Sequence, residues 1–422
     1  MIIGSGLPAI RDMLLLQKNE LDLGLRQRYI KRDAKIKGIS SDVIKVIIGP
    51  RRAGKSFFAT HELLGSGSFG YVNFDDEALS EIKDYNEVVT EINSLYDKPK
   101  FLLFDEIQNL ERWELFVNRM QRQGYNLIIT GSNSNLLSKE LATHLTGRHL
   151  TTNIFPLSFK EFISYDGREM SESEMRTRFS DYLERGGYPE PLVKGLDYNE
   201  YLSALFDSVI YKDIVKRYRI RKPKVVEELA RYLISNSAKE FSYGNLAKMT
   251  NSDSDVTIKR YLGYLEEAFL FFEVGRYSAK VKEQVTSNKK IYCIDNGLIR
   301  AKAFRTGEDR GRLYENLAAI ELMRRSSDGV LELYYWKNQQ HEEVDFVVKM
   351  QGKITKLLQV CSDISRANTK NRETRALLKC SRELKCNDLT VLTSDYEAKE
   401  KIEWFGIRRD IKFVPMWKWL TA

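Results

Sequence analysis

Short apolar runs alternate with amphipathic stretches in the first third of the chain. The runs are rich in β-branched and aromatic residues and predict strands at Val43–Ile48, Tyr71–Phe74, Phe101–Phe104, Leu127–Thr130 and Thr151–Phe155. The stretches between them predict helices, notably Ser56–Leu64, which Gly65 ends, and Arg112–Gln123. Strands that alternate with helices are typical of a parallel sheet with both faces covered. We therefore expect an α/β domain here.

The next region reads as helical from Ser158 to about Ser237, interrupted by Gly186–Pro189. Three helices and two short strands then follow in the order of a winged helix-turn-helix, at Val225–Ile234, Ser242–Met249, Asp253–Phe272, Leu270–Val274 and Lys290–Ile294. The last region again mixes helices with strands. Its elements are predicted at Leu313–Arg324, Val330–Trp336, Val344–Val348, Ile354–Val360, Thr369–Leu384 and Leu389–Thr393.

Composition narrows the class of protein. The chain has 422 residues, of which 42% are hydrophobic and 30% are charged, and its formal net charge is +8, so we expect a globular, mildly basic protein of several domains. No apolar run approaches the roughly 20 residues that a membrane-spanning helix needs. Four cysteines without a C-x-x-C pair favour neither a zinc site nor a disulfide framework. These observations, and the lack of a signal-peptide pattern, predict a cytoplasmic protein without a membrane partner.

One motif matches a phosphate-binding loop (Walker A) at every position. The segment 49–56 fits G-x-x-x-x-G-K-[ST] and lies between a predicted strand and a predicted helix. Its backbone N–H groups would surround phosphate oxygens, Lys55 would reach the β- and γ-phosphates of ATP, and Ser56 would hold Mg²⁺. The residues predicted to bind the nucleotide here are Gly49, Pro50, Arg51, Arg52, Ala53, Gly54, Lys55, Ser56 and Phe57.

A second motif (Walker B) supports an ATPase-type site. The apolar run Phe101–Phe104 ends in two carboxylates, Asp105 and Glu106. Asp105 is predicted to hold Mg²⁺, and Glu106 to polarise the attacking water. With Lys55 and Arg148, which is discussed next, these two residues form the predicted catalytic set.

Two further candidates have equally good alternative interpretations. Ser132 and Asn133, in the segment Gly131–Ser134 after a buried strand, could sense the γ-phosphate, or they could form a polar turn. Arg148, after Thr146 and Gly147, could neutralise charge in the transition state, in its own chain or in a second subunit. Its alternative is a surface arginine.

These motifs together carry a family resemblance. The segments 49–56, Asp105–Gln108, Thr130–Ser134, Leu145–Arg148 and Phe155–Phe159 resemble the prokaryotic AAA-type ATPases that carry a C-terminal domain of unknown function. Val344–Val347 and Leu358–Val360 are similar to the second half of that family, which resembles a winged helix followed by a restriction-endonuclease-like fold. The resemblance extends over nearly the whole chain and implies nucleotide binding.

Positive charge is concentrated in one short segment. Between 212 and 224 there are seven basic residues and one acid, Asp213, with Tyr211 and Tyr218 interleaved. Such clustering predicts a basic helix that tracks the phosphates of double-stranded DNA, although a solvated face that pairs with acidic groups is the alternative. The basic residues are Lys212, Lys216, Arg217, Arg219, Arg221, Lys222 and Lys224.

The winged helix-turn-helix adds modest support for DNA. Helical spacing places Ile258 and Leu262 on an inner face and leaves Lys259 and Arg260 outward, where they could reach DNA phosphates. The neighbouring acids at 266 and 267 weaken this interpretation. A plain protein-interaction module is therefore an equal alternative.

The C-terminal region is predicted to lack nuclease chemistry. Glu315 on a helix, and Asp345 and Glu343 on a strand, could share a site. Gln359 stands where a third carboxylate is expected, and it brings no charge to a hard cation. A displaced lysine at 349 or 353 would need a bulge to turn inward. The alternative to a shared site is that Glu315 and Asp345 form a structural pair, bonded for instance to the backbone or to Arg312.

The sequence thus predicts an α/β protein with a P-loop ATPase core of AAA type, a helical region with a winged helix, and an endonuclease-like α/β domain. The predicted divisions are 1–42, 43–156, 157–237, 238–300 and 301–422. ATP and Mg²⁺ are the expected ligands. DNA is the favoured macromolecular partner of a Mg-dependent ATPase. A nucleotide-gated switch that binds a protein is the alternative, a nuclease is disfavoured, and assembly into an oligomer is compatible with the sequence.

Overall fold

A computed structural model describes residues 10–422, apart from 78, 80–81, 83, 134–147, 252–253, 305–309 and 327–328. The chain divides into two compact units, each described here by itself. Unit 1 comprises Met1–Phe155 with Glu267–Phe269, and unit 2 comprises Pro156–Glu266 with Leu270–Ala422.

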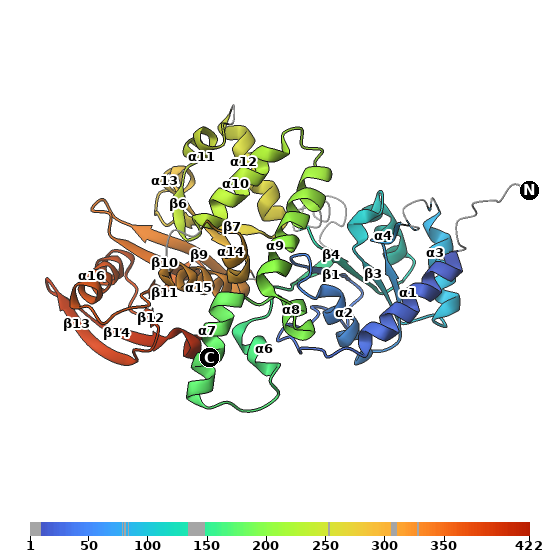
Figure 1. Ribbon diagram of the computed structural model, residues 1–422, viewed down its shortest axis with the longest axis horizontal. Coiled ribbons are helices and arrows are strands. Elements are labelled where there is room, and N and C mark those ends of the chain that lie inside the picture. Colours follow the sequence, from blue (N-terminus) through green and yellow to red (C-terminus); the bar gives the residue numbers. More distant parts are fainter. Residues whose placement is uncertain are drawn as a thin grey trace, which may run out of the picture. The chain divides into compact units, whose positions relative to one another are not determined.

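Unit 1 contains a five-stranded parallel sheet in the order β2-β3-β4-β1-β5 (Figure 1). The strands are β1 (Ile44–Ile48), β2 (Phe69–Asn73), β3 (Phe101–Asp105), β4 (Leu127–Gly131) and β5 (His149–Asn153). The helices are α1 (Ile10–Leu25), α2 (Lys55–Leu64), α3 (Tyr85–Leu95) and α4 (Trp113–Arg122). The predicted strands and helices of this region are therefore confirmed, within a few residues at their ends.

The sheet of unit 1 is covered on both faces because successive strand residues point to opposite sides. On one face Val46, Phe104 and Ile129 pack with residues of α1, α3 and α4. On the other face, the neighbouring residues Ile47, Leu103 and Ile128 pack with α2. Parallel register brings the carboxyl ends of β1, β3 and β4 to the same edge. That edge carries the candidate site.

Unit 2 begins with helices, as predicted. They are α6 (Phe159–Ser164), α7 (Glu172–Arg185), α8 (Pro189–Lys194), α9 (Tyr198–Ser208), the π-helical segment η3 (Val209–Lys216) and α10 (Pro223–Ser235). The predicted interruption at Gly186–Pro189 separates α7 from α8. Gly187 must be a glycine, because a Cβ there would lie 2.2 Å from the carbonyl oxygen of Leu157.

The prediction of one basic helix over 212–224 is wrong. The helical turns of η3 end at Lys216, Arg219 has a left-handed backbone (φ 49°), and α10 starts with Pro223. Proline favours the first turn of a helix because it lacks a backbone N–H. The seven basic residues therefore lie on two helices and the turn between them.

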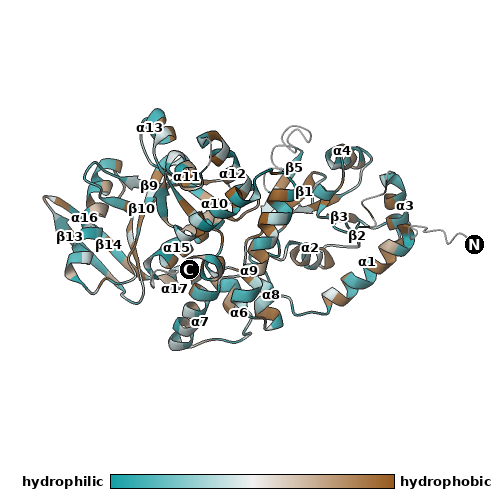
Figure 2. Cartoon of the chain, turned by 45° about the horizontal axis from the view of Figure 1, so that its top comes forward, coloured by the Kyte–Doolittle hydropathy of each residue, from teal (hydrophilic) through white to brown (hydrophobic). Residues whose placement is uncertain are grey.

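A nine-stranded mixed sheet forms the rest of unit 2, in the order β13-β14-β12-β11-β10-β9-β7-β8-β6. Its strands are β6 (Lys239–Phe241), β7 (Phe271–Arg276), β8 (Lys289–Cys293), β9 (Leu331–Lys337), β10 (Glu343–Met350), β11 (Lys353–Val360), β12 (Leu389–Thr393), β13 (Ala398–Trp404) and β14 (Ile407–Pro415). Strands from both predicted C-terminal domains share this sheet, because β7 pairs with β9. The edge strand β13 alternates half-buried with exposed residues and is largely hydrophilic (Figure 2).

The helices of this part are α11 (Tyr243–Met249), α12 (Asp255–Glu267), α13 (Val281–Thr286), α14 (Asn296–Lys302), α15 (Arg310–Ser326), α16 (Ala367–Leu384) and α17 (Met416–Thr421). Helix α12 is shorter than the predicted Asp253–Phe272, because the chain leaves the helix after Glu267 and Phe269 has φ 56°. Asp253 lies outside the described residues. The helices α13, α14 and α17 and the strands β6, β13 and β14 were not predicted from the sequence.

Every helix in the described ranges is too short or too polar to span a lipid bilayer.

Candidate functional site

The phosphate loop lies between β1 and α2 and needs its glycines. Gly49 and Gly54 have φ angles of 156° and 90°. A Cβ on Gly49 would lie 1.9 Å from the carbonyl oxygen of Ile154 on the neighbouring chain segment. Because β1 ends where α2 begins, the loop presents backbone N–H groups at a helix N-terminus, an arrangement that favours phosphate. The local geometry fits the sequence motif.

Lys55 is the first residue of α2 and is 4% exposed. Its Nζ donates to the carbonyl oxygen of Pro50 (3.1 Å) and lies 3.6 Å from Glu106 Oε1. The loop backbone thus folds over the lysine and holds its ammonium group toward the carboxylates at the end of β3. A phosphate at the loop would meet this positive charge at close range.

The other side chains of the loop differ in their surroundings. Arg51 lies 3.7 Å from Asp75, whereas Arg52 is exposed and has φ 63°. Phe57 stacks on His61 within α2, with ring centroids 5.6 Å apart. The side chain of Phe57 therefore belongs to the helix packing, and a contact of its backbone with nucleotide stays a prediction.

Asp105 ends β3 and is buried among hydroxyl groups. Ser56 Oγ donates to Asp105 Oδ1 (2.8 Å), Thr130 Oγ1 donates to the same oxygen, and Tyr71 OH donates to Oδ2 (3.0 Å). Burial, and then the neighbouring Glu106, raise the pKa of Asp105, while the hydroxyl bonds and Lys55 oppose that shift. A cation at this carboxylate would stabilise its charged form.

Glu106 follows directly in a left-handed backbone conformation (φ 51°). Its backbone N–H donates to Thr130 Oγ1 (3.1 Å), and its Oε2 accepts from Ser132 Oγ (3.1 Å) and from Gln108 Nε2. Burial alone would raise the pKa of Glu106, but Lys55 and the bonds from Gln108 and Ser132 lower it overall. Glu106 is therefore held as a carboxylate, the form that a general base requires.

The donor set at the end of β3 fits Mg²⁺. Ser56 Oγ and Asp105 Oδ1 are 2.8 Å apart, and both are the hard oxygen ligands that Mg²⁺ prefers. One hydroxyl and one carboxylate would leave several coordination positions for phosphate oxygens and water. Ser56 and Asp105 are the residues that would hold this ion.

Ser132 and Asn133 follow β4 and are both buried. Ser132 contacts the Glu106 carboxylate, so the structure brings it into the site beside the predicted catalytic residues. Sensing of the γ-phosphate by Ser132 or Asn133 stays a prediction. Ser134 lies outside the described residues.

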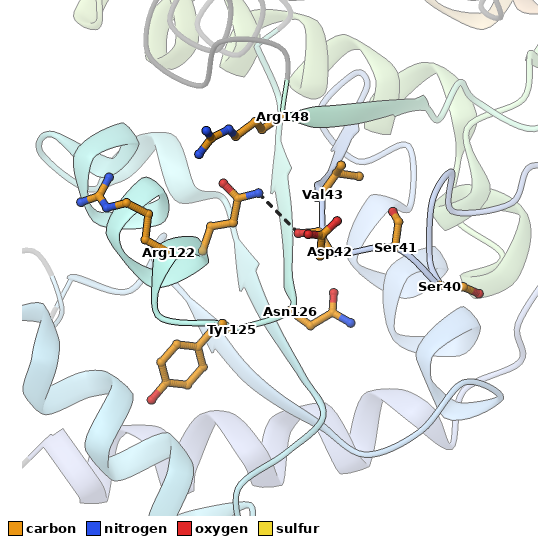
Figure 3. A pocket seen from close by; sticks show the side chains of 10 residues that line it. Ser40, Ser41, Asp42, Val43, Arg122, Tyr125, Asn126 and Arg148 are labelled. Atoms are coloured by element: carbon orange, nitrogen blue, oxygen red, sulfur yellow. Dashed lines mark hydrogen bonds between the residues drawn. The ribbon is translucent and has the colours of Figure 1, made fainter.

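Arg148 lies just before β5, toward the end of the sheet opposite the phosphate loop. Ile44 pairs with His149 at the start of β1, while the phosphate loop follows Ile48 at the other end, about 13 Å along the strand. Arg148 lines a pocket of about 580 Å³ with Ser41, Asp42 and Arg122 (Figure 3). The structure does not bring Arg148 into contact with Lys55, Asp105 or Glu106, and its predicted role, in its own chain or in a second subunit, stays a prediction. Thr146 and Gly147 lie outside the described residues.

Sequence reasoning missed four residues of the site. Tyr71 and Thr130 bind Asp105, Gln108 binds Glu106, and Arg32 binds the phosphate loop through the carbonyl oxygen of Ala53 (3.0 Å). Thr130 had a usable signal, since it occupies on β4 the position that Asp105 occupies on the neighbouring strand. Arg32 had none, because it binds the backbone carbonyls of Ala53 and Phe155.

The basic segment of unit 2, residues 212–224, shows features both of a DNA-binding surface and of a solvated face that pairs with acidic groups. Lys212, Lys216, Arg219, Arg221, Lys222 and Lys224 are exposed, and Arg217 is half-buried. The two interleaved tyrosines have protein partners, since Tyr218 stacks on Tyr264 (centroids 3.7 Å) and Tyr211 OH donates to Glu227 (2.8 Å). The tyrosines thus anchor the segment, and the positive charge remains on its surface.

Helix α12 has the predicted faces. Ile258, Leu262 and Leu265 are buried, whereas Lys259 and Arg260 are exposed. Whether this surface meets DNA stays a prediction.

A second cluster of charges lies in unit 2, around a lysine that sequence analysis did not single out. Lys290 on β8 is buried, and its Nζ lies 2.7 Å from Glu315, 2.5 Å from Glu343 and 3.3 Å from Asp345. Tyr292 OH also donates to Glu315 (2.8 Å). The predicted convergence of Glu315, Glu343 and Asp345 therefore occurs, with an ammonium group at its centre.

The partners of Asp345 and Gln359 agree with a structural role. Asp345 Oδ2 accepts from the backbone N–H of Val360 (2.9 Å), while Gln359 accepts from the N–H of Asp345 (3.2 Å) and donates to Glu373 (2.9 Å). Burial, and then Glu315, raise the pKa of Asp345 to about 7. No group of His, Cys, Asp or Glu side chains in the described part of the chain, this cluster included, is placed to hold a metal ion.

Three family models match successive parts of the chain. Residues 41–163 match the model of an AAA domain. Residues 176–309 and 310–416 match two domains of unknown function, DUF8612 and DUF4143.

Two curated relatives resemble the chain over most of its length. An uncharacterized protein of Methanocaldococcus jannaschii is 35% identical over 421 residues, which cover 95% of this chain and 93% of that protein. An uncharacterized protein of Haemophilus influenzae is 31% identical over 349 residues, 78% of this chain and 84% of its own. A solved Walker-type ATPase of Pyrococcus abyssi is 15% identical with a TM-score of 0.41, covering 68% of this chain and 94% of its own. The chain therefore belongs to the family of AAA-type P-loop ATPases in which the AAA domain precedes two C-terminal domains of unknown function.

Proposed function

We propose that the protein is a Mg-dependent ATPase that couples its nucleotide state to a macromolecular partner, with double-stranded DNA favoured. One observation carries the ATPase part: Lys55, Asp105 and Glu106 meet at one edge of the sheet of unit 1. Each has the type and position that phosphoryl transfer to water requires.

In this mechanism the chain mainly positions the reactants. The phosphate loop and Lys55 bind the β- and γ-phosphates, and Ser56 and Asp105 hold Mg²⁺, which would neutralise developing negative charge on the phosphate oxygens. Glu106 accepts a hydrogen bond from the attacking water and orients it, while Gln108 and Ser132 fix its carboxylate.

The proposal of DNA rests on charge. Six exposed basic residues, Lys212, Lys216, Arg219, Arg221, Lys222 and Lys224, lie within thirteen positions of the chain, and exposed cations of this density attract a phosphate backbone. A nucleotide-gated switch that binds a protein is the second candidate, favoured by Glu266 and Glu267 on α12. All four cysteines are free and buried, in keeping with a reducing compartment such as the cytoplasm.

ATP turnover measured with and without double-stranded DNA, at 50 and 200 mM salt, tests the proposal. We expect turnover in the wild type, its loss in Lys55→Ala, and stimulation by DNA that fades at the higher salt concentration. ATP turnover that DNA does not stimulate would support the ATPase activity but favour the protein-binding switch over DNA binding. No turnover and no ATP binding would overturn the proposal.

A charge-reversal pair identifies the DNA surface. Arg219→Glu with Arg221→Glu should weaken DNA binding and reduce the slope of log affinity against log salt by about two. Lys353→Glu with Lys401→Glu, two exposed lysines elsewhere in unit 2, makes the same change in net charge and serves as the control. Equal effects of the two pairs would show that the basic segment is not the contact.

A further inference from the structure

Arg32 connects the phosphate loop to the end of unit 1. The residue lies between α1 and β1, is 5% exposed, and extends its guanidinium between two distant backbone carbonyls. Its Nη1 donates to the oxygen of Ala53 (3.0 Å), in the phosphate loop, and its Nη2 donates to the oxygen of Phe155, just after β5. One side chain therefore bridges residues 53 and 155.

The first bond fixes the orientation of a peptide inside the loop. In a trans peptide the carbonyl oxygen and the following N–H point in opposite directions. Because Arg32 binds the oxygen of Ala53, the N–H of Gly54 points away from Arg32. The N–H groups of a phosphate loop are what it offers to phosphate oxygens, so Arg32 maintains one of them in a set direction.

A second link joins the same two segments. The N–H of Ile154 donates to the oxygen of Ile48 (2.8 Å), and Gly49 packs so closely on Ile154 that no Cβ fits between them. The start of the phosphate loop thus contacts Ile154, and its middle contacts Phe155 through Arg32. Movement of the loop on binding phosphate would displace both contacts.

The chain is also held on the far side of the Phe155–Pro156 peptide, within unit 2. Arg324 donates to the oxygen of Pro156 (2.9 Å). The N–H of Leu157 donates to Gly187 (2.6 Å), and Tyr182 OH donates to the oxygen of Leu157 (2.7 Å). The last residue of unit 1 and the first residues of unit 2 are therefore each bonded within their own unit.

We propose that Arg32 is a positioning residue that couples the state of the phosphate loop to the backbone segment 153–157 leading into unit 2. The inference rests on the proposed ATPase function and adds a regulatory path to the same site. Arginine suits this role because its planar fork reaches two acceptors at once, whereas lysine carries a single ammonium group.

Three variants test the role of Arg32. Arg32→Gln removes the fork and its charge, Arg32→Lys keeps the charge without the fork, and Lys31→Gln changes the exposed neighbour as a control. Each full-length protein is measured for KM and kcat with ATP, for thermal stability, and for amide hydrogen exchange over 153–157. Exchange is compared without nucleotide and with a saturating non-hydrolysable ATP analogue.

In the wild type and in Lys31→Gln we expect the analogue to slow exchange over 153–157. In Arg32→Gln, KM should rise about tenfold, as for the loss of one charged hydrogen bond, and kcat should change less. The slowing of exchange over 153–157 should disappear even when the analogue is saturating. Arg32→Lys should recover most of the thermal stability but not the slowing. This variant keeps the test available where Arg32→Gln does not fold.

The coupling would be overturned if the analogue slowed exchange in Arg32→Lys as much as in the wild type. It would also be overturned if the analogue caused no slowing in a wild type that hydrolyses ATP. Both outcomes would leave the proposed ATPase intact. A variant that loses only thermal stability, with KM and slowing unchanged, would reduce Arg32 to a structural residue. A wild type that binds no ATP would overturn the proposed function itself, and the inference with it.

Discussion

Each unit contains a buried lysine close to carboxylates. The two clusters differ in how completely the protein's own carboxylates pair with the ammonium group. In unit 1, Lys55 lies 3.6 Å from Glu106 and donates to a loop carbonyl. In unit 2, Lys290 has three carboxylates within 3.3 Å, from Glu315, Glu343 and Asp345. The residue types are similar, yet only the first arrangement keeps positive charge for a ligand.

Backbone geometry accounts for this difference. Lys55 extends from a glycine-containing loop at a helix N-terminus, where N–H groups surround the space above the ammonium. Lys290 is the second residue of β8, where neighbouring elements fill the space around it with side chains. Burial lowers the pKa of Lys290, but Tyr292 and the carboxylates raise it well above its ordinary value. Lys290 thus occupies the place that a metal ion would need.

Glu106→Gln should produce the largest change in the first cluster. Turnover should fall by about 10²–10⁴-fold, the usual contribution of a general base, while ATP binding persists because Lys55, Ser56 and Asp105 remain. Steady-state ATPase assays and nucleotide titration measure the two effects, and Glu111→Gln, an exposed neighbour, is the control. Unchanged turnover would remove Glu106 from the mechanism.

Lys290→Met should produce the largest change in the second cluster. Three carboxylates would lose their cation, and breaking a buried ion pair in this way costs about 3–5 kcal/mol of unfolding free energy. Denaturant unfolding measures the loss. Lys349→Met removes a half-buried surface lysine partnered by Glu332 and should have a smaller effect. Added Mn²⁺ should restore part of the stability of Lys290→Met alone, and equal stability of the two variants would contradict our account of the cluster.

The pKa of Asp345 predicts a pH dependence of unit 2. A shift from 3.8 to about 7 favours the protonated carboxyl in the folded state. Its stabilising contribution is therefore full below pH 4 and is lost as the pH rises to about 7, with at most about 4 kcal/mol involved. Asp345→Asn should flatten the fall in unfolding temperature over this range, and the exposed Asp410→Asn should not. Parallel pH profiles in Asp345→Asn and the wild type would contradict this pKa.

Lys55→Ala should weaken ATP binding by about 30-fold, since a charged hydrogen bond to phosphate is lost. Isothermal titration with ATP and Mg²⁺ measures the affinity, and Lys35→Ala, which removes an exposed lysine near α2, is the control. An unchanged affinity would mean that the resting contact of Lys55 with Glu106 persists when nucleotide binds.

The last prediction is that the protein does not cleave DNA. Supercoiled plasmid incubated with the wild type and Mg²⁺ or Mn²⁺ should remain intact, because Lys290 occupies the centre of the carboxylate cluster. Cleavage that disappears in Asp345→Ala would show that the cluster is an active site after all.

The two clusters also show what a sequence reveals. The first was predictable because its parts follow local patterns: Lys55 lies in a contiguous motif, and Asp105 and Glu106 end an apolar strand. The second was half predictable, since Glu343 and Asp345 share a strand face by spacing. Lys290 was missed because it lies 25 residues before Glu315 and 55 before Asp345, and only the fold of unit 2 brings them together.

Other failures arose from backbone conformation. The basic segment was treated as one helix because its charges are contiguous, although Pro223 signalled a new helix start. No residue pattern announces the left-handed turn at Arg219. The sequence offered Arg148 as a group that neutralises transition-state charge, but it could not show that parallel register puts the start of β5 at the end of the sheet opposite the phosphate loop. Arg32 binds backbone carbonyls, which leave no trace in a sequence.

The pairing of β7 with β9 has a consequence for how this chain can be divided. A fragment ending at 309 would expose the edge of β7, and a fragment starting at 310 would expose the edge of β9. Unpaired edges of this kind recruit other strands and promote aggregation. We therefore expect the two C-terminal regions to remain soluble only when they are expressed together. Protease cleavage between them should leave two pieces that co-purify.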